Sequence, residues 1–313
     1  MKDLYDTRFQ SVKEIQQEFE SHQYICNTQI ATCVYIAHNL QKPVMVEGPA
    51  GVGKTELAKT TAEILGVPLV RLQCYEGLDE SKALYEWKYG KQLLYTQLLK
   101  DKLGDVLDGA VGLSQSMVKL QNHEDLFFSE GFLEPRPLYK ALQEEHGCVL
   151  LIDEIDKSDH EFEAFLLEIL SEFQVSIPEL GTIKAKIKPL VFLTSNNTRE
   201  MSDALKRRCL HLHIDFPDEQ LERRILNKRV PELSANLTKE VVSFVQQIRE
   251  LDLKKAPSVA ESIDWAKTLL LLHAEHLDTA LVKDTLNVIL KFEDDIAAVN
   301  EQAAKFIKKA KAQ

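Results

Sequence analysis

Two glycines, a lysine and a threonine form the most informative spacing in this chain. Gly48, Gly53, Lys54 and Thr55 match the pattern G-x-x-x-x-G-K-[ST], which follows an apolar run at 44–46 and opens a helical pattern. Glycines let successive backbone N–H groups face one anion, and the start of the helix adds its positive dipole end. Lys54 is expected at the β and γ phosphates of a nucleotide, and the Thr55 hydroxyl as a ligand of Mg²⁺. The predicted phosphate-binding residues are Gly48, Pro49, Ala50, Gly51, Val52, Gly53, Lys54, Thr55 and Glu56.

A pair of acids ends the second informative stretch. The apolar residues 148–152 lead into Asp153 and Glu154. Such a run is typical of a strand buried on both faces, and its carboxyl end lies at the sheet edge where parallel sheets bind ligands. We predict that Asp153 holds Mg²⁺ through its water shell and that Glu154 is the general base for an attacking water. The alternative is a solvated Asp-Glu turn, which the phosphate pattern in the same chain disfavours.

Polar groups further along the chain could complete such a site. Asn196 follows the apolar run 189–194 and could align the attacking water, although two asparagines after a strand usually form only a turn. Arg207 and Arg208 belong to a run of three cations at the end of a short helical pattern. A run of this kind is usually a solvated face, and its charge also suits the negative helix terminus.

The elements that must position these residues begin as strand, helix and strand. The helix from Thr55 is followed by a strand at 67–72, and this order implies a parallel α/β unit. Before it, we expect an irregular opening and then a helix from Thr28. After it, the patterns predict a strand at 148–152, a helix at 158–173, a hairpin at 175–188, and strands at 189–194 and 210–214. Beyond Pro217 the patterns are purely helical, at about 218–229, 238–250, 258–273, 277–290 and 294–310.

The stretch between Cys74 and Pro137 is the hardest to interpret. Its patterns suggest a helix at 83–100, a glycine-containing segment at 104–112 and an apolar cluster at 126–128. Four aromatic residues crowd its start, namely Tyr85, Trp87, Tyr89 and Tyr95. Packing against the main domain is the favoured explanation for them, and a loop that grips a partner is the alternative.

Composition narrows the class of protein. The chain has 313 residues, a net charge of −11 and five scattered cysteines. The acidic total argues against a broad nucleic-acid-binding face, and no C-x-x-C pair indicates a zinc site. Neither a signal peptide nor an apolar run of about 18 residues is found, so we expect a reduced cytoplasmic protein that could reach a membrane only through a partner. The four histidines near strands or helices are interpreted as structural, namely His211, His213, His273 and His276.

Taken in order, these motifs resemble those of AAA+ ATPases. The residues that carry the resemblance are 48–55, 149–154, 194–196 and 204–208, and it extends over nearly the whole chain. Within AAA+ proteins the chain is similar to the MoxR family, specifically the CoxD-like branch that is paired with von Willebrand factor A domain proteins. Three further segments support that branch: Tyr85-Glu86-Trp87 with Lys91–Leu94, Arg136-Pro137-Leu138, and Pro257–Trp265.

The resemblance implies a fold and a set of roles. It implies a parallel P-loop sheet flanked by helices in a nucleotide-binding domain at 1–216, with a helical lid domain at 217–313. The lid follows two insertions in the first domain, a helix-2 insert at about 77–134 and a pre-sensor-1 hairpin at about 175–188. The motifs at 48–55 and 153–154 become Walker A and Walker B for ATP and Mg²⁺, and Asn196 becomes sensor 1.

It also implies that part of the active site acts between subunits. Arg208 would be an arginine finger for the neighbouring subunit of a ring, commonly a hexamer, with Arg207 as the second candidate. The usual Gly-x-Arg of sensor 2 is replaced by Ala256-Pro257-Ser258, so lid coupling is in doubt. Lys254 or Lys255 is a possible substitute, and no sensor 2 residue is assigned.

Three functions remain as hypotheses. The first is an ATP-hydrolysing, chaperone-like remodeller of a partner, with a von Willebrand factor A domain protein and a client enzyme, during maturation of an enzyme or metal centre. The second is a nucleic-acid motor, supported only by Lys184, Lys186 and Lys188 on the hairpin. The third is a non-catalytic scaffold switched by nucleotide, for which the missing sensor 2 arginine is the one indication.

Overall fold

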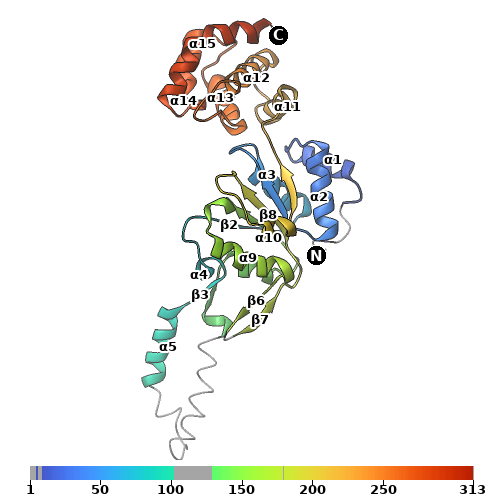
Figure 1. The fold of residues 1–313 in the computed structure, drawn as a ribbon, viewed down its shortest axis with the longest axis vertical. Coiled ribbons are helices and arrows are strands. Elements are labelled where there is room, and N and C mark those ends of the chain that lie inside the picture. Colours follow the sequence, from blue (N-terminus) through green and yellow to red (C-terminus); the bar gives the residue numbers. More distant parts are fainter. Residues whose placement is uncertain (1–4, 6–8, 102–128, 179, 313) are drawn as a thin grey trace, which may run out of the picture.

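The computed structural model describes residues 5, 9–101, 129–178 and 180–312, and arranges them around one parallel sheet (Figure 1). The sheet has the strand order β2-β5-β8-β1-β9. Its strands are β1 (Val44–Glu47), β2 (Leu69–Gln73), β5 (Val149–Asp153), β8 (Leu190–Ser195) and β9 (Leu210–His213). All four pairings are parallel, as strand-helix-strand succession predicts. The predicted α/β sheet is therefore confirmed.

The strand register gathers the polar strand ends at one edge. Glu47 at the end of β1 pairs with Ser195 of β8, and Gln73 at the end of β2 pairs with Asp153 of β5. Every residue of β5 and β8 is buried, because these strands lie inside the sheet with helices on both faces. Because β5 and β8 are buried along their whole length, the residues that follow them have fixed positions at the carboxyl edge of the sheet.

Helices cover both faces of the sheet. On one face, α1 (Val12–Ser21), α2 (Thr28–Leu40) and α3 (Lys54–Leu65) enclose a core that includes Phe19, Val34 and Leu57. On the other face lie α8 (Pro137–Gln143), α9 (His160–Glu172) and α10 (Asp203–Arg208). A 3-10 turn, η2 (Ile155–Lys157), connects β5 to α9.

Helix α1 contradicts the irregular opening that was predicted. Its N-cap is Ser11, whose hydroxyl accepts a hydrogen bond from the Glu14 N–H. Ile15 and Phe19, one turn apart, are fully buried. Val12 lies on the same face at helical spacing and packs against the same core. An apolar period is therefore present in the sequence, although it is short and surrounded by polar residues.

The segment after β2 is also only partly as predicted. Instead of one helix at 83–100, it contains α4 (Glu80–Ala83), β3 (Tyr85–Trp87) and α5 (Tyr89–Asp101). Strand β3 pairs antiparallel with β4 (Leu133–Pro135), which follows η1 (Glu130–Phe132). Helix α5 extends away from the body at the end opposite the C-terminal helices (Figure 1). The predicted features at 104–112 and 126–128 lie outside the described residues.

The aromatic residues of this segment divide between core and surface. Trp87 is buried and Tyr85 packs against the same core, as the packing explanation predicts. Tyr89, by contrast, is 67% exposed, and Tyr95 is 45% exposed while its ring meets Phe132 edge-on. Only the two residues on β3 therefore serve the main core.

The hairpin exists with a shorter second arm than predicted. It consists of β6 (Gln174–Ile177) and β7 (Gly181–Lys184), paired antiparallel. Gly181 is the first residue of β7 and has φ +77°, so the turn lies before it rather than around it.

Five helices follow Pro217, as the patterns predict. They are α11 (Glu219–Arg229), α12 (Ala235–Arg249), α13 (Val259–Leu271), α14 (Thr279–Ile289) and α15 (Glu293–Ala312). They enclose a separate core around Phe244 and the fully buried Trp265. Within the described part of the chain, none of the helices has the length and apolar character needed to cross a bilayer.

Candidate functional site

The predicted phosphate loop connects β1 to α3 with almost no spare room. Gly48 has φ +146°, and a Cβ there would lie 1.9 Å from the carbonyl oxygen of Ile214. Gly51 has φ +74°, and its Cβ would meet the Ser258 side chain at 2.5 Å. Both positions therefore require glycine for backbone conformation and for space. This explains the glycine spacing and places the start of α13 directly against the loop.

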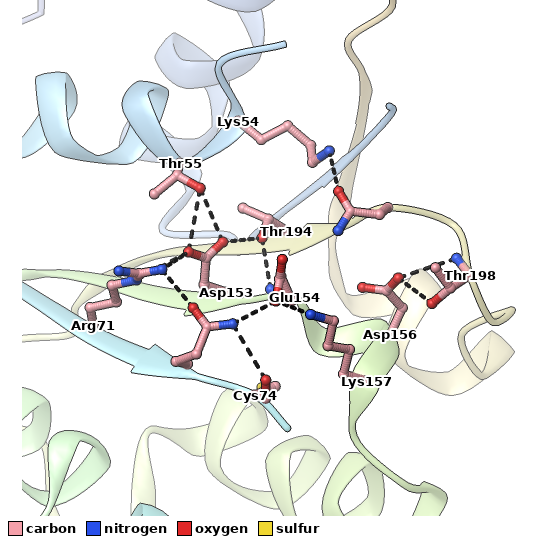
Figure 2. Close-up of polar contacts among 12 residues, drawn as sticks. Lys54, Thr55, Arg71, Cys74, Asp153, Glu154, Asp156, Lys157, Thr194 and Thr198 are labelled. Carbon is pink, nitrogen blue, oxygen red and sulfur yellow. Dashed lines mark hydrogen bonds and ion pairs between the residues drawn. The ribbon is translucent and has the colours of Figure 1, made fainter. Parts of the chain in front are cut away.

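Lys54 lies under the loop and links it to β8. Its Nζ donates to the Gly48 carbonyl at 2.6 Å and to the Pro49 carbonyl at 2.7 Å. It also donates to Asn196 Oδ1 at 2.8 Å (Figure 2). Burial lowers the pKa of Lys54, and the nearby carboxylates of Asp156, Asp153 and Glu154 partly offset that effect. The three acceptors of the Lys54 ammonium group are thus neutral oxygens. Anionic phosphate oxygens would accept stronger hydrogen bonds from it.

The loop that carries Asn196 is held in place by the buried side chain of Asp156. Asp156 accepts hydrogen bonds from the Thr198 backbone N–H at 3.2 Å and from its hydroxyl at 2.5 Å (Figure 2). Asp156 belongs to η2, which directly follows the two predicted acids. The same short turn therefore positions the end of β5 and the residues after β8.

Asp153 is the most heavily hydrogen-bonded of the predicted groups. Oδ1 accepts from the Thr55 hydroxyl at 3.1 Å and from the Thr194 hydroxyl at 2.5 Å. Oδ2 accepts from Arg71 Nε at 3.0 Å and from Arg71 Nη2 at 2.7 Å (Figure 2). The Asp153 side chain is only 4% exposed, whereas that of Arg71 is 50% exposed. Thr55 and Asp153, predicted together from the sequence, are in direct contact.

Glu154 has a backbone that few non-glycine residues adopt. Its φ of 57° and ψ of 49° lie in the left-handed region, which costs on the order of 1–2 kcal/mol for a residue with a Cβ. The backbone N–H of Glu154 donates to the Thr194 hydroxyl at 2.9 Å. Its Oε2 accepts from Gln73 at 2.8 Å and from Lys157 Nζ at 2.6 Å (Figure 2). The carboxylate is thus held to one side by two donors.

Arg71, Gln73 and Thr194 were missed by the sequence reasoning. Arg71 and Gln73 alternate along β2, so that both side chains lie on the face that also carries Asp153. The signal that could have found them is this register, because a polar residue at every second position of an edge strand next to the acid-bearing strand is placed to contact the acids. Thr194 belongs to an apolar run and to the segment 194–196 that carries the family resemblance, but the sequence assigns it no role at the site.

A cavity of about 640 Å³ opens above these groups, a volume suited to a small ligand. Its polar end includes Lys54, Thr55, Asp153, Glu154 and Asn196. Its other end is largely apolar and combines the segment before α2, the loop after β9 and two C-terminal helices, through Tyr24, Ile25, Ile214, Pro217, Leu221, Ile225 and Ile263. The cavity lining thus combines polar groups suited to phosphates with apolar side chains suited to the less polar part of a nucleotide.

The C-terminal helices contact the phosphate loop at two points. Arg229 of α11 donates to Glu56 at 2.7 Å, and the Ala260 N–H of α13 donates to the Gly51 carbonyl at 3.3 Å. The two suggested substitutes for sensor 2 do not lie at the cavity within the described structure: Lys254 pairs with Asp294 and Lys255 with Glu261. On α13, Asp264 and Lys267 line the cavity instead.

The two arginines proposed as fingers lie away from this cavity. Arg208 donates from Nε to the Ser171 hydroxyl at 2.8 Å, and both Arg207 and Arg208 are exposed at the end of α10. Among the described residues that line the cavity, neither arginine is included. They therefore cannot complete the site of their own chain in this conformation.

The oxygen donors present suit a small divalent cation. The Thr55 hydroxyl and the Asp153 carboxylate are hard oxygen ligands, the kind that Mg²⁺ takes together with water and substrate phosphates. Because they lie beside Lys54 at the phosphate loop, the chain's residues fit a metal held jointly with a nucleotide.

Comparison with known proteins agrees with this geometry. Residues 44–218, more than half of the chain, match the sequence model of AAA, described as the ATPase family associated with various cellular activities. Uncharacterised proteins from the USA300 and NCTC 8325 strains of Staphylococcus aureus are each 22% identical over 268 residues. Those alignments cover 82% of this chain and 87% of each relative.

Among solved structures, a Thermotoga maritima RuvB Holliday junction branch migration motor is similar at 17% identity with a TM-score of 0.45. The alignment covers 91% of this chain and 73% of that one. A mutant of the same motor gives 16% identity and a TM-score of 0.46, with 94% and 75% covered.

Proposed function

The chain belongs to the AAA family, and from that premise we propose that this ATPase works as a ring whose nucleotide cycle remodels a partner protein. In this proposal the cavity holds ATP with its phosphates at Lys54 and its base at the apolar end. Thr55 and Asp153 hold Mg²⁺, which when bound neutralises charge that develops on the phosphate oxygens.

The chemical step relies on three groups of the chain. Glu154 accepts the proton of the attacking water, Asn196 orients that water, and Lys54 holds the β and γ phosphates. Lys54 and Asn196 are already hydrogen-bonded to each other, so both are close to where the terminal phosphate would sit. A positioning role for the amide follows from that contact.

The ring proposal rests on the distance between the two arginines and the cavity of their own chain. Lys54, Asp153, Glu154 and Asn196 surround one cavity, whereas Arg207 and Arg208 of the same chain are exposed elsewhere in the described structure. An arginine that stabilises transferring phosphate must reach it directly. We therefore assign these arginines to the site of a neighbouring copy, which makes a closed ring, commonly of six subunits in such proteins, the working assembly.

The helix α5 is the part of the proposed remodeller that would contact a partner. Its exposed apolar side chains include Tyr89 at 67%, Leu93 at 62% and Leu94 at 54% exposed. Apolar side chains that cluster on a projecting helix favour an interaction surface over solvent. We propose a MoxR-type role in the cytoplasm, in which a von Willebrand factor A domain protein and a client enzyme or metal centre are the targets.

A nucleic-acid motor is less well supported by the charges. Of the three hairpin lysines, Lys186 lies 3.7 Å from Glu145, and Lys188 lies over the ring of Phe173. With a net charge of −11 the chain offers little attraction for a phosphate backbone. A turnover rate that rises with added DNA or RNA at low salt would favour the motor over the remodeller.

The experiment that tests the proposal compares the wild type with Glu154→Gln. The variant keeps the hydrogen bond to Gln73 but loses the base, so we expect ATP binding within about twofold and turnover lower by roughly 10²–10⁴. Phosphate release under multiple-turnover conditions measures the rate. A turnover rate in the variant equal to that of the wild type would contradict the role of Glu154 as the base. If the wild-type protein never exceeds one turnover per subunit, the result would favour the nucleotide-switched scaffold.

A further inference from the structure

Arg71 forms an ion pair with Asp153. It sits on the edge strand β2, two residues before Gln73, which is in register with Asp153 on β5. Side chains two residues apart share a face of the strand, so the long Arg71 side chain runs along that face toward the carboxylate. Its guanidinium approaches Oδ2 with two N–H groups, at 3.0 and 2.7 Å.

These bonds leave no acceptor site open on Asp153. A carboxylate has about four lone-pair positions, two on each oxygen. Here the Thr55 and Thr194 hydroxyls donate to Oδ1 and two Arg71 N–H groups donate to Oδ2, with the Thr55 hydroxyl also 3.3 Å from Oδ2. A metal ion, or a water of its shell, can reach Asp153 only if one of these donors leaves.

Arg71 is the donor best able to leave. The Thr194 hydroxyl is buried and also accepts the Glu154 N–H, so its position is fixed from two sides. Thr55 is itself the other residue proposed for the metal. Arg71 is half exposed and lines the cavity, so its side chain can turn into solvent without opening the core.

Charge gives a second reason why Arg71 and a divalent cation exclude each other. A guanidinium and Mg²⁺ on the same carboxylate would repel, and the buried position of Asp153 screens that repulsion less than water would. In the free chain the Arg71 charge stabilises a buried carboxylate that would otherwise have no cation in direct contact.

We propose that Arg71 competes with the divalent cation of the nucleotide site for Asp153. Arg71 neutralises Asp153 in the free chain and leaves it when a metal–nucleotide complex binds. The inference rests on the proposed function, which places the metal at Thr55 and Asp153. It assigns a positioning role to Arg71. It also implies that Arg71 lowers the affinity of the nucleotide-free site for a divalent cation.

The test measures metal binding directly. Mn²⁺ takes the same oxygen ligands as Mg²⁺, and its unbound fraction can be counted by electron paramagnetic resonance. Mn²⁺ is titrated into the full chain with saturating ADP, for the wild type, Arg71→Gln, Arg71→Lys and Arg224→Gln. ADP binding in EDTA is measured by calorimetry for each variant. Arg224→Gln is the matched control, because it also removes a partly exposed arginine from an ion pair, here with Glu20, but one that does not line the cavity.

We expect Arg71→Gln to bind Mn²⁺ roughly tenfold more tightly than the wild type, as loss of a charge-assisted pair implies. Arg71→Lys should give a smaller gain because lysine lacks the fork geometry, and it carries the test if the glutamine variant does not fold. Arg224→Gln should leave Mn²⁺ affinity unchanged. Metal-free ADP affinity should be the same in the wild type and both Arg71 variants.

Two results would overturn the inference alone. Unchanged or weaker Mn²⁺ binding in the Arg71 variants would mean that no competition exists. Weaker metal-free ADP binding would instead make Arg71 a phosphate ligand. If the wild type binds ADP but no Mn²⁺, the placement of the metal in the proposed function fails as well, so the two failures can be told apart.

Discussion

The Nζ of Lys54 donates a 2.8 Å hydrogen bond to Oδ1 of Asn196, which lies 142 residues later in the chain. This contact connects the phosphate loop to the end of β8. It places an amide next to the group that we propose as the partner of the terminal phosphate, so the fold itself holds these two groups of the site together. A preorganised pair of this kind loses little free energy to rearrangement during the reaction.

Asn196→Ala should separate binding from chemistry. We expect the ATP dissociation constant to stay within about threefold, and the turnover number to fall by roughly 10²–10³, the cost of removing one positioned polar group. Equilibrium ATP binding and steady-state phosphate release measure the two quantities. Asn197→Gly is the matched control, since Asn197 is exposed with φ +59°, which glycine tolerates. Equal losses in the two variants would contradict a specific role for Asn196.

Lys157→Ala should raise basal turnover. Lys157 Nζ lies 2.6 Å from the Glu154 oxygen and competes with the water proton for it. Lys157 is largely exposed, so the gain should be modest, about two- to fivefold. Lys157→Arg keeps the charge and should stay near the wild-type rate. A lower rate in Lys157→Ala would show that the lysine assists Glu154 instead.

A buried ion pair should dominate the stability of the C-terminal helices. Arg249 of α12 makes two hydrogen bonds of 2.7 Å to Glu222 of α11, and their side chains are 7% and 0% exposed. Glu222→Ala leaves the Arg249 charge buried without its anionic partner, so we expect a loss of about 3–5 kcal/mol in the free energy of unfolding.

Urea unfolding can be followed by tryptophan fluorescence in a Trp87→Phe background, because Trp265 is then the one tryptophan of the chain and lies in this core. Asp294→Ala, which breaks the exposed pair with Lys254, is the control and should leave the unfolding midpoint unchanged. Similar shifts for both variants would contradict the importance of burial.

Much of the fold could be predicted because strong patterns coincide with buried elements. The apolar runs before Asp153 and before Asn196 became β5 and β8, two interior strands of the sheet, whose helix-covered faces require continuous apolar sequence. Helix α1 and strand β3 are harder to predict. The apolar period of α1 is short, with Val12, Ile15 and Phe19 among polar residues, and β3 is set by pairing with β4, more than 40 residues away in the chain.

The candidate site divides along the same line. Lys54, Thr55 and the two acids follow from local spacing, because the loop and the strand ends are continuous in sequence. Arg71 and Gln73 do not, because their contacts depend on which strand lies beside β5 and in which register. The cavity wall from α13 likewise depends on packing of the C-terminal helices over Gly51, which no spacing in the sequence specifies.

The central claim, that one subunit supplies the arginine for its neighbour's site, is tested most directly by mixing two inactive variants. Glu154→Gln subunits keep both arginines but lack the base, and subunits with Arg207→Ala and Arg208→Ala keep the base. Each alone should be slower than the wild type, the arginine variant by about 10³–10⁵.

In randomly mixed rings, about one interface in four joins an intact site to an intact arginine pair, and phosphate release should recover in proportion. Differently tagged subunits that co-purify confirm that mixed rings have formed. Recovered turnover is the result predicted here. Mixed rings that hydrolyse ATP no faster than the two variants separately would contradict a shared active site.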